Sequence, residues 1–396
     1  MGQVITSGHQ PGFHHPGILA KRLALDAAAR DSGAEAVWLV ADQDVDAPEV
    51  VRYPDLDAAG RLVARTWRLR PIRQGVPTCS RTWGRMTPPP VVSQDLPPSI
   101  NRGLQAMHDA LDGVPGDSVA ERFRAAEAVL LRDLLQSEVR YVRASELLGR
   151  EPGGSILQRV LEDPVRCARV WNHGLGLVPR SGRRLAIDED DPGRTEVPVW
   201  LLGEGGIRRR AGAREVARAV SAGEAVLPRA FLMTAVLRAM TGGVMIHGTG
   251  GGRYEAVTDH WSDGFLGRTL PEIRVVSRDL RLPLEGFLTP LESDPDRDEL
   301  RDLEHDPWDS GGAKQDWLDR IRSAPRRSPE RRRLFLEMHE SMHQGRQRIA
   351  GRLDRLRARR HEEQARVGEH RVARDRTWAW PLHERAALLD ATGCRG

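Results

Sequence analysis

Residues 4–21 read VITSGHQPGFHHPGILAK, and this stretch decides which fold the chain is expected to adopt. A short apolar run at 4–6 leads into a loop with three histidines and two Pro-Gly pairs, and a helix-forming segment follows at 17–30. A strand–loop–helix unit of this kind presents backbone N–H groups to an anionic ligand, because the first turn of a helix has N–H groups without partners. The stretch therefore predicts an α/β fold with a ligand site at this loop.

A second strand is expected directly after that helix. Residues 35–41, EAVWLVA, form a continuous apolar run, which is typical of a parallel strand buried on both faces. The run ends in an acidic loop that contains Asp42 and Asp44. Ligands bind outside the carboxyl ends of the strands in open α/β sheets, so this loop is expected near the same site. Strand, helix and strand together make a βαβ unit with a right-handed crossover.

Lys21 stands out because lysine is almost absent from this chain. The sequence has 60 lysines and arginines together, and only Lys21 and Lys314 are lysines. A generic basic surface position would be expected to carry arginine here, so Lys21, in the first turns of the helix after the loop, is a candidate functional residue. The alternative, an ordinary surface lysine, stays open on sequence alone.

The loop and the start of its helix offer several kinds of ligand contact. His9 and His15 can donate hydrogen bonds to phosphate oxygens or act as acid and base near neutral pH, and Lys21 adds a positive charge. We assign catalytic roles to His9, His15, Lys21, Asp42 and Asp44. The ligand-binding positions of this loop are Ser7, Gly8, Gln10, Gly12 and Gly17. The structural alternative is a turn whose histidines cap the helix or face solvent.

A second glycine-bearing turn follows a strand predicted at 244–246. Residues 247–254 read HGTGGGRY, and a glycine run at this place allows the backbone to approach a ligand closely. The run lacks the last glycine of the dinucleotide fingerprint and the GK[ST] of a P-loop. We expect it to meet the first loop in one site, with contacts from His247, Gly248, Gly250, Gly251, Arg253 and Tyr254. The alternative is a flexible turn.

Residues 339–343, HESMH, formally match the HExxH zinc motif on a predicted helix. Helical spacing of four would place His339 and His343 on one face, with the glutamate between them as the base. A third ligand would have to come from Glu362 or Glu363, which requires a tight hairpin in the charged C-terminal segment. Short motifs of this kind arise readily by chance, so zinc hydrolysis is the weakest of the functional hypotheses.

The remaining patterns divide the chain into an α/β core at 1–324 and a helical arm with a C-terminal tail at 325–396. Strand patterns occur at 61–69, 197–202, 244–246 and 273–284, and helical patterns at 100–111, 118–135, 154–172, 214–222 and from Pro228. The helices between about 98 and 180 interrupt the α/β alternation, which predicts an inserted helical region.

The C-terminal arm is helix-forming and heavily charged from residue 328 to about 376. Much of its apolar spacing is three, four or seven residues, which is typical of a coiled-coil or helical-hairpin seam: Leu334, Met338, Met342, Ile349, Leu353 and Leu356. Such an arm could join two copies of the chain as a homodimer. We interpret its arginine-rich face as solvated rather than as a nucleic-acid contact.

The charge balance, the lack of long apolar runs and the few cysteines limit the classes of protein to which this chain can belong. The 396 residues carry 60 basic and 56 acidic side chains, so the net charge of +4 is weak evidence for a nucleic-acid partner. No apolar run approaches the ~20 residues of a membrane span, and no signal-peptide pattern precedes the first strand. Three scattered cysteines, Cys79, Cys167 and Cys394, indicate no disulfide framework and no metal spacing. We expect a cytoplasmic protein with a small-molecule substrate and no membrane contact.

The segments SGHQPGFHHPGILAK and VWLVADQDVD resemble the opening of the bacillithiol-synthesis cysteine-adding enzyme family. That family begins with a Thr-Gly-Gln-Gln-Pro-Gly loop, a glycine/proline helix entrance and a nearby lysine, followed by a strand that ends in an acidic loop. The likeness covers about the first 50 residues, where Ser7 and His9 replace a threonine and a glutamine. The matching positions are Gly8, Gln10, Pro11, Gly12 and Lys21, with Asp42 and Asp44 in the acidic loop.

Two further likenesses rest on the same segments. The chain resembles a planctomycete-type group of bacterial proteins with a GHQPxxxHPG opening and an HGxGGxxY segment, and more faintly the WbqC-like family, whose opening has a His-Gln-Pro loop.

The resemblance to the cysteine-adding family implies a fold and an activity. The fold is a Rossmann-like core related to nucleotidyltransferases, with an α-helical coiled-coil part. The activity is that of a ligase that joins a cysteine-like amino acid to a small polar or amino-sugar acceptor, with a nucleotide such as ADP or ATP bound at the first loop. The alternative is a non-catalytic nucleotide- or metabolite-binding protein whose arm mediates assembly.

Overall fold

The computed structural model describes residues 3–241, 243–291, 296–308 and 313–392, and the chain divides into two compact units. The first unit comprises Met1–Asp55, Ala64–Pro283 and Asp375–Gly396, and the second comprises Leu56–Val63 and Leu284–Arg374. Most of the second unit thus begins at residue 284, ahead of the boundary at 325 expected from the sequence, and the C-terminal tail belongs to the first unit.

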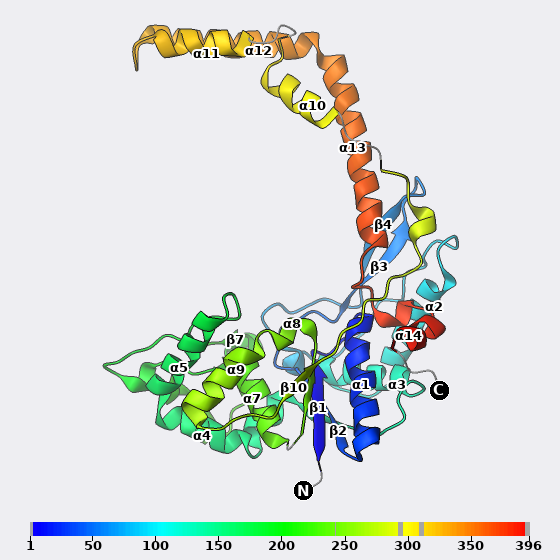
Figure 1. The fold of residues 1–396 in the computed structure, drawn as a ribbon, viewed down its shortest axis with the longest axis vertical. Helices are drawn as coiled ribbons and strands as arrows, with labels where there is room; N and C mark the ends of the chain where they lie inside the picture. Colours follow the sequence, from blue (N-terminus) through cyan, green and yellow to red (C-terminus); the bar gives the residue numbers. More distant parts are fainter. Residues whose placement is uncertain (1–2, 242, 292–295, 309–312, 393–396) are drawn as a thin grey trace. The chain divides into compact units, whose positions relative to one another are not determined.

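A parallel sheet forms the centre of the first unit (Figure 1). In the described ranges it has five strands: β1 (Val4–His9), β2 (Glu35–Val40), β5 (Val139–Arg143), β9 (Met245–His247) and β10 (Ile273–Val275). Their order is β10-β9-β1-β2-β5, and every neighbouring pair is parallel. The predicted α/β class with a Rossmann-like parallel core is confirmed at this level.

The strand β2 lies between β1 and β5 and is buried on both faces, as its apolar run predicted. Trp38 faces the core formed with α1 (Pro16–Ser32), and its neighbour Leu39 faces the larger core that includes α7 (Ala230–Met240). Figure 1 shows α1 on one side of the sheet and α7 on the other. Helices on both faces explain why β2 carries no alternation of apolar and polar residues.

The strand order places a topological switch point between β1 and β9. From β1 the chain moves outward through β2 to β5, and it then returns to the other side of β1 to add β9 and β10. In doubly wound sheets, ligands bind outside the carboxyl ends of the two strands where the order reverses. Those two strands here lead directly into the histidine loop and the glycine run.

The segment between residues 98 and 180 supplies helices and also a strand of the central sheet. Its helices are α2 (Pro98–Asp112), α3 (Val119–Leu131), α4 (Gly153–Glu162) and α5 (Pro164–Leu177), and β5 lies between α3 and α4 in the chain. This region is therefore not a helical insertion alone. This edge strand has five residues, VRYVR, and two of them are arginines, so its sequence lacks the continuous apolar run that marks β2.

The helix predicted at 154–172 is wrong in one respect, because it is two helices. Pro164 has no N–H to continue a helix, and the side chain of Asp163 accepts a hydrogen bond from the N–H of Arg166 to cap a new one. The break allows α4 and α5 to pack at an angle in the same core.

Smaller elements complete the first unit. Strands β6 (Val199–Leu202), β7 (Arg208–Arg209) and β8 (Val226–Pro228) form a second sheet in the order β7-β6-β8. A two-stranded sheet pairs β3 (Val50–Leu56) with β4 (Leu62–Arg68), and all of its residues except Leu56, Leu62 and Val63 belong to the first unit. The helices are α6 (Ala213–Ser221), α8 (Thr249–Gly252), α9 (Glu255–Trp261) and α14 (Arg385–Thr392). Pro228 ends β8 instead of starting a helix, and the strand predicted at 273–284 is short, since its pairing with β9 ends at Val275.

Helices make up most of the second unit: α10 (Asp296–His305), α11 (Ala313–Ser323), α12 (Pro329–Arg348) and α13 (Ala350–Ala373). The predicted helical arm is confirmed as helix. A non-helical residue, Ile349, separates α12 from α13. Neither α10 nor α11 was predicted, because charged residues dominate their sequences.

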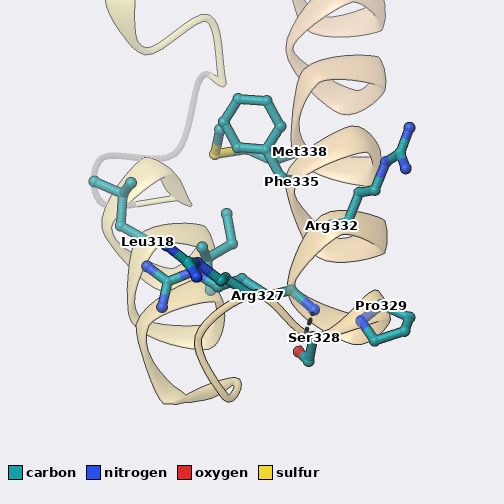
Figure 2. Close-up of a pocket in the computed structure, with 9 residues that line it drawn as sticks. Leu318, Arg327, Ser328, Pro329, Arg332, Phe335 and Met338 are labelled. Carbon is teal, nitrogen blue, oxygen red and sulfur yellow. Dashed lines mark hydrogen bonds between the residues drawn. The ribbon is translucent and has the colours of Figure 1, made fainter.

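The apolar stripe of the arm is buried within the second unit by these two shorter helices. Leu334, Met338 and Met342 form one core with Ile321 of α11, and a second core joins Leu353 and Leu356 to Leu300 of α10. Figure 2 shows residues of α11, α12 and their connection that line a pocket, among them Leu318, Arg327 and Met338. Most seam positions therefore already have partners in the same chain.

In the ranges that the structure describes, no helix combines the length and the apolar character that crossing a bilayer requires. Cys79 and Cys167 are free thiols, and burial raises their pKa values to about 11 and about 12. Both are therefore protonated at neutral pH, and Cys394 lies outside the described residues.

Candidate functional site

The two glycine-bearing turns are neighbours at the switch point. Ser7, near the end of β1, donates a 2.8 Å hydrogen bond from Oγ to the carbonyl of Ile246 on β9, across 239 positions of sequence. The space where Gly248 would carry a Cβ lies 3.7 Å from Cδ of Lys21. The sequence predicts one site formed by both turns, and the structure places them together at the carboxyl edge of the sheet.

Lys21 lies at the centre of this edge and is 2% exposed. Its Nζ donates a 2.6 Å hydrogen bond to the Gly8 carbonyl, and it lies 5.5 Å from the centroid of the Trp38 ring. Burial lowers the pKa of Lys21 to about 7, against an opposing effect of Glu127. A substantial fraction of this amine is therefore neutral at physiological pH. The alternative of an ordinary surface lysine is wrong.

Lys21 belongs to a buried group of charged and aromatic side chains that the sequence analysis did not find. Arg22 stacks its guanidinium 4.2 Å from the Trp38 ring centroid and donates a hydrogen bond to the Tyr141 hydroxyl. Burial raises the pKa of Glu127 on α3, and the charges of Arg22 and Lys21 oppose that rise. These partners come from α1, β2, β5 and α3, so only tertiary structure brings them together.

The first loop contains a pair of neutral histidines. His9 Nδ1 lies 3.1 Å from His14 Nε2, which also lies 2.8 Å from the Gln10 carbonyl. Burial lowers the pKa of His9 well below its ordinary value and that of His14 to about 4. Both imidazoles are therefore neutral at physiological pH, and they offer hydrogen bonds rather than positive charge. His14 was not among the predicted site residues.

His15 is the N-cap of α1. Its Nδ1 accepts a 3.1 Å hydrogen bond from the Gly17 N–H, and burial lowers its pKa. A Cβ on Gly17 would fall 2.9 Å from the Arg278 carbonyl and 2.7 Å from the His15 ring, so only glycine fits there. The capping role that the structural alternative predicted for the loop histidines holds for His15. The N–H groups of residues 17–19 have partners within the turn, which leaves this helix start fewer donors for an anion.

Asp42 is fully buried and holds the ends of two strands together. Its Oδ1 accepts a 2.8 Å hydrogen bond from the Ser145 N–H, and its Oδ2 accepts one of 2.6 Å from the Ser145 hydroxyl. Burial raises the pKa of this carboxyl, and the Ser145 hydrogen bonds oppose the rise. Since both oxygens have partners, Asp42 positions the loop after β2 rather than contacting a substrate.

Asp44 connects the acidic loop to the histidine loop. Its Oδ2 accepts a 3.1 Å hydrogen bond from Gln10 Nε2, and its Oδ1 accepts one of 2.8 Å from the Val45 N–H. Arg208 lies 3.4 Å from the same carboxylate. Gln10 and Gly12 thus sit in a loop that is tied to its neighbours at the edge of the sheet, and Asp44 stays partly exposed there.

The second turn wraps around the ring of His247. A Cβ on Gly251 would lie 1.5 Å from Cε1 of His247, so the imidazole occupies the space that a side chain there would need. His247 Nε2 lies 3.9 Å from Oε1 of the buried Glu255, which pairs with Arg238 at 2.9 Å. Burial and the nearby Lys21 lower the pKa of His247 to about 4, so this ring is also neutral.

The outer part of the second turn faces solvent. Gly250, Arg253 and Tyr254 are exposed, whereas Gly248 and Gly251 are only partly exposed. Arg253 is therefore the accessible cation at this end of the site. Glu255 and Arg238, which carry the buried ion pair behind the turn, were not predicted, because nothing in the local sequence separates them from other helical charges.

The HExxH motif lies on α12 in the second unit. His339 contacts the Phe335 ring at 4.4 Å between centroids, and His343 Nε2 lies 3.0 Å from the Gln347 amide nitrogen; both histidines are exposed. Among the residues that the structure describes, no three His, Cys, Asp or Glu side chains gather as a metal site. The helix of this motif is confirmed, and the structure shows no third ligand near it.

The chemistry available at the switch point is thus that of a buried, partly neutral amine beside neutral imidazoles, with one exposed arginine at the rim. This set can move a proton near neutral pH and can donate hydrogen bonds to an anionic group. No protein-family model matches the chain, and no curated protein sequence matches it.

Proposed function

We propose that the protein is an enzyme that joins a cysteine-like amino acid to a small polar or amino-sugar acceptor at the switch point of its Rossmann-like core. The observation that carries this proposal is Lys21: a buried amine at the carboxyl end of β1, beside both glycine turns, with a pKa of about 7. Burying a lysine is unfavourable for folding, and perturbed lysines of this kind are concentrated at functional sites.

Lys21 is the proton acceptor in this proposal. A general base works best when its pKa lies near the working pH, because it is then both unprotonated and basic enough. The acceptor amine attacks the carboxyl carbon of the cysteine-like substrate after ATP has activated that carboxyl, and the bond to the phosphate-bearing leaving group breaks. The neutral amine of Lys21 takes the proton that the attacking nitrogen loses, and the paired imidazoles of His9 and His14 orient polar groups by hydrogen bonds. Asp44 and Gln10 hold the loop that carries these histidines.

The second turn is the better place for a phosphate or carboxylate. Gly250 and Arg253 are exposed there, whereas the N–H groups at the start of α1 already have partners within the turn. A nucleotide such as ADP or ATP, which the family resemblance implies, would therefore place its phosphates against Arg253 and the glycine backbone. Charge from such a ligand would raise the pKa of Lys21, so its binding would be coupled to proton uptake.

Ligand binding is tested by thermal-shift measurements of the full chain against nucleotides, cysteine and amino sugars. We expect a rise in Tm with one of these, and we expect Lys21→Ala to abolish it. Lys314→Ala is the matched control, because Lys314 is the second lysine of the chain and lies on α11. This variant should keep the shift in Tm. A ligand shift that survives Lys21→Ala would refute the site assignment.

Turnover is tested by mass spectrometry of mixtures of cysteine and amino-sugar acceptors, with and without ATP. The condensation product should form with wild-type protein, and its kcat/KM should rise with pH through about 7 as Lys21 loses its proton. Absence of any product from a chain that binds ligand normally favours the alternative, a non-catalytic metabolite-binding protein. Two observations already favour that alternative: Asp42 and His15 are both engaged in holding the fold.

We also propose that the second unit mediates self-association as a coiled-coil-like arm. Phe335 and Leu336 remain 49% and 58% exposed on α12, next to the buried stripe residues Leu334, Met338 and Met342. A pair of glutamate substitutions at these positions should shift the molar mass measured by light scattering from dimer to monomer. A wild-type chain that is monomeric at the same concentration contradicts this.

A further inference from the structure

Two histidines face each other on neighbouring helices of the first unit, outside the site described above. His173 on α5 and His260 on α9 bring Nδ1 and Nε2 to 2.9 Å from each other, with ring centroids 4.8 Å apart. His173 is exposed, and His260 is partly exposed. No role in the proposed reaction involves either residue.

The packing of α5 against α9 holds these rings in place. Gly174 lets the helices approach: a Cβ there would lie 3.2 Å from both His260 Cδ2 and Val257 Cγ1. Beneath the histidines, Trp171 and Trp261 pack edge to face in the core, with centroids 6.1 Å apart. The two imidazoles therefore belong to rigid elements, and their approach requires no rearrangement of the helices.

We propose that His173 and His260 form a two-imidazole site for a divalent transition metal ion of the Cu²⁺, Ni²⁺ and Zn²⁺ class. Imidazole nitrogens bind such ions at about 2.0–2.1 Å, so two cis ligands at a right angle lie about 2.9 Å apart. That separation equals the distance between these two nitrogens. Tetrahedral geometry needs about 3.3–3.4 Å, which a small rotation of one exposed ring supplies.

The ion would keep open coordination positions. Within the described ranges, no third His, Cys, Asp or Glu completes a cluster with this pair, so water or a small ligand fills the remaining positions. Without metal, the same separation suits an N–H···N hydrogen bond between the two rings. To bind the metal, the donating ring moves its proton to its other nitrogen, so that both facing nitrogens offer lone pairs, and the metal ion then links α5 to α9.

The test uses the tag-free full chain in a His343→Ala background, which removes the competing i,i+4 histidine pair of α12. Cu²⁺ added at one equivalent should give an electron paramagnetic resonance spectrum with coupling to two imidazole nitrogens. Ni²⁺ should raise Tm, because a ligand that binds only the folded chain stabilises it. Both effects should weaken more than about tenfold in apparent affinity in His173→Ala and in His260→Ala, since one imidazole loses the chelate partner.

His361→Ala is the matched control, because it removes an exposed histidine on α13. It should bind metal as the background protein does. Each variant is first compared by its metal-free Tm, and His173→Gln serves if an alanine variant unfolds. Metal uptake that is unchanged in both single variants, or no uptake by the background protein, overturns the proposal.

Discussion

At the scale of single residues, the cost of burying Lys21 gives a prediction with a definite sign. Burial lowers its pKa to about 7, whereas a lysine in the unfolded chain titrates near its ordinary value of 10.5. Between these values the unfolded chain binds more protons, so the free energy of unfolding rises with pH through this window. Below pH 7 the whole desolvation penalty of Lys21 opposes folding.

Lys21→Met should therefore stabilise the fold while it abolishes ligand binding. Methionine keeps the length of the side chain without the charge, although it loses the hydrogen bond to the Gly8 carbonyl. We expect a gain of about 1–3 kcal/mol in the free energy of unfolding at pH 7. Urea unfolding at pH 7 and pH 10 measures it, and the gain should shrink at pH 10. A variant less stable than wild type at pH 7 would mean that the buried amine is well accommodated.

Two glycines of the second turn, Gly250 and Gly251, differ in the space that a Cβ atom would have. A Cβ on Gly251 would overlap the His247 ring at 1.5 Å, whereas nothing lies within 4 Å of the corresponding position on Gly250. Gly251→Ala should displace His247, destabilise the fold by about 1–3 kcal/mol and weaken ligand binding. Gly250→Ala should change stability by less than about 1 kcal/mol. Thermal unfolding of both variants measures these changes in stability. Equal losses of stability in the two variants would contradict the position of His247 within this turn.

At the scale of elements, the link between the ends of β2 and β5 is a pair of hydrogen bonds. Ser145 gives both its N–H and its hydroxyl to the buried carboxylate of Asp42. Ser145→Ala leaves one carboxylate oxygen without that donor and should destabilise the chain by about 1–3 kcal/mol. Ser155→Ala, which removes an exposed hydroxyl bond to Glu151, should have almost no effect. Denaturation in urea measures both, and a neutral Ser145→Ala would show that water replaces the lost bond.

The elements that sequence could predict are those with a strong local signal. The apolar run at 35–41 and the glycine- and proline-rich loop before α1 are local patterns, and together they predict the βαβ unit. The glycine run after His247 likewise predicts a turn near this unit. β5 is short and contains two arginines, α10 carries few apolar residues, and the places of both elements depend on partners far away in the chain. The same holds for the site. The rarity of lysine in the sequence indicates Lys21, but the roles of Glu127 and Ser145 follow only from the tertiary structure, which brings them to Lys21 and Asp42.

At the scale of the whole molecule, the C-terminal tail returns to the first unit and reaches the histidine loop. The Trp380 N–H donates a 2.7 Å hydrogen bond to the His14 carbonyl, and Trp378 is fully buried beside Arg52, whose guanidinium lies 5.1 Å from its ring centroid. The two tryptophans within residues 378–380 indicate, from sequence alone, a tail that packs back on the core. The C-terminal tail thus contacts the N-terminal histidine loop within the first unit. Loss of the packing of the tail would therefore disturb the loop that carries His9 and His14.

His383, next in this tail, makes that link dependent on pH. Burial lowers its pKa to about 4, and in the described structure its Nε2 is buried without a hydrogen-bond partner. Between pH 6.5 and pH 4 the unfolded chain therefore binds a proton that the folded chain excludes, so this histidine lowers stability as the pH falls. Buried carboxyls with raised pKa values, such as Asp42 and Glu127, act in the opposite direction, so the stability of wild type alone does not isolate it.

The difference in free energy of unfolding between His383→Phe and wild type isolates the contribution of this histidine to the pH dependence. Phenylalanine fills the same site and takes up no proton, so the variant's stability relative to wild type should increase by roughly 2–3 kcal/mol from pH 7 to pH 4. An imperfect fit of the larger ring would shift this difference equally at both pH values and leave its slope unchanged. His361→Phe, at an exposed position, should show no such slope. Urea unfolding at four pH values between 7 and 4 gives the slope, and a flat difference for His383→Phe would mean that the imidazole stays solvated or protonated in the folded chain.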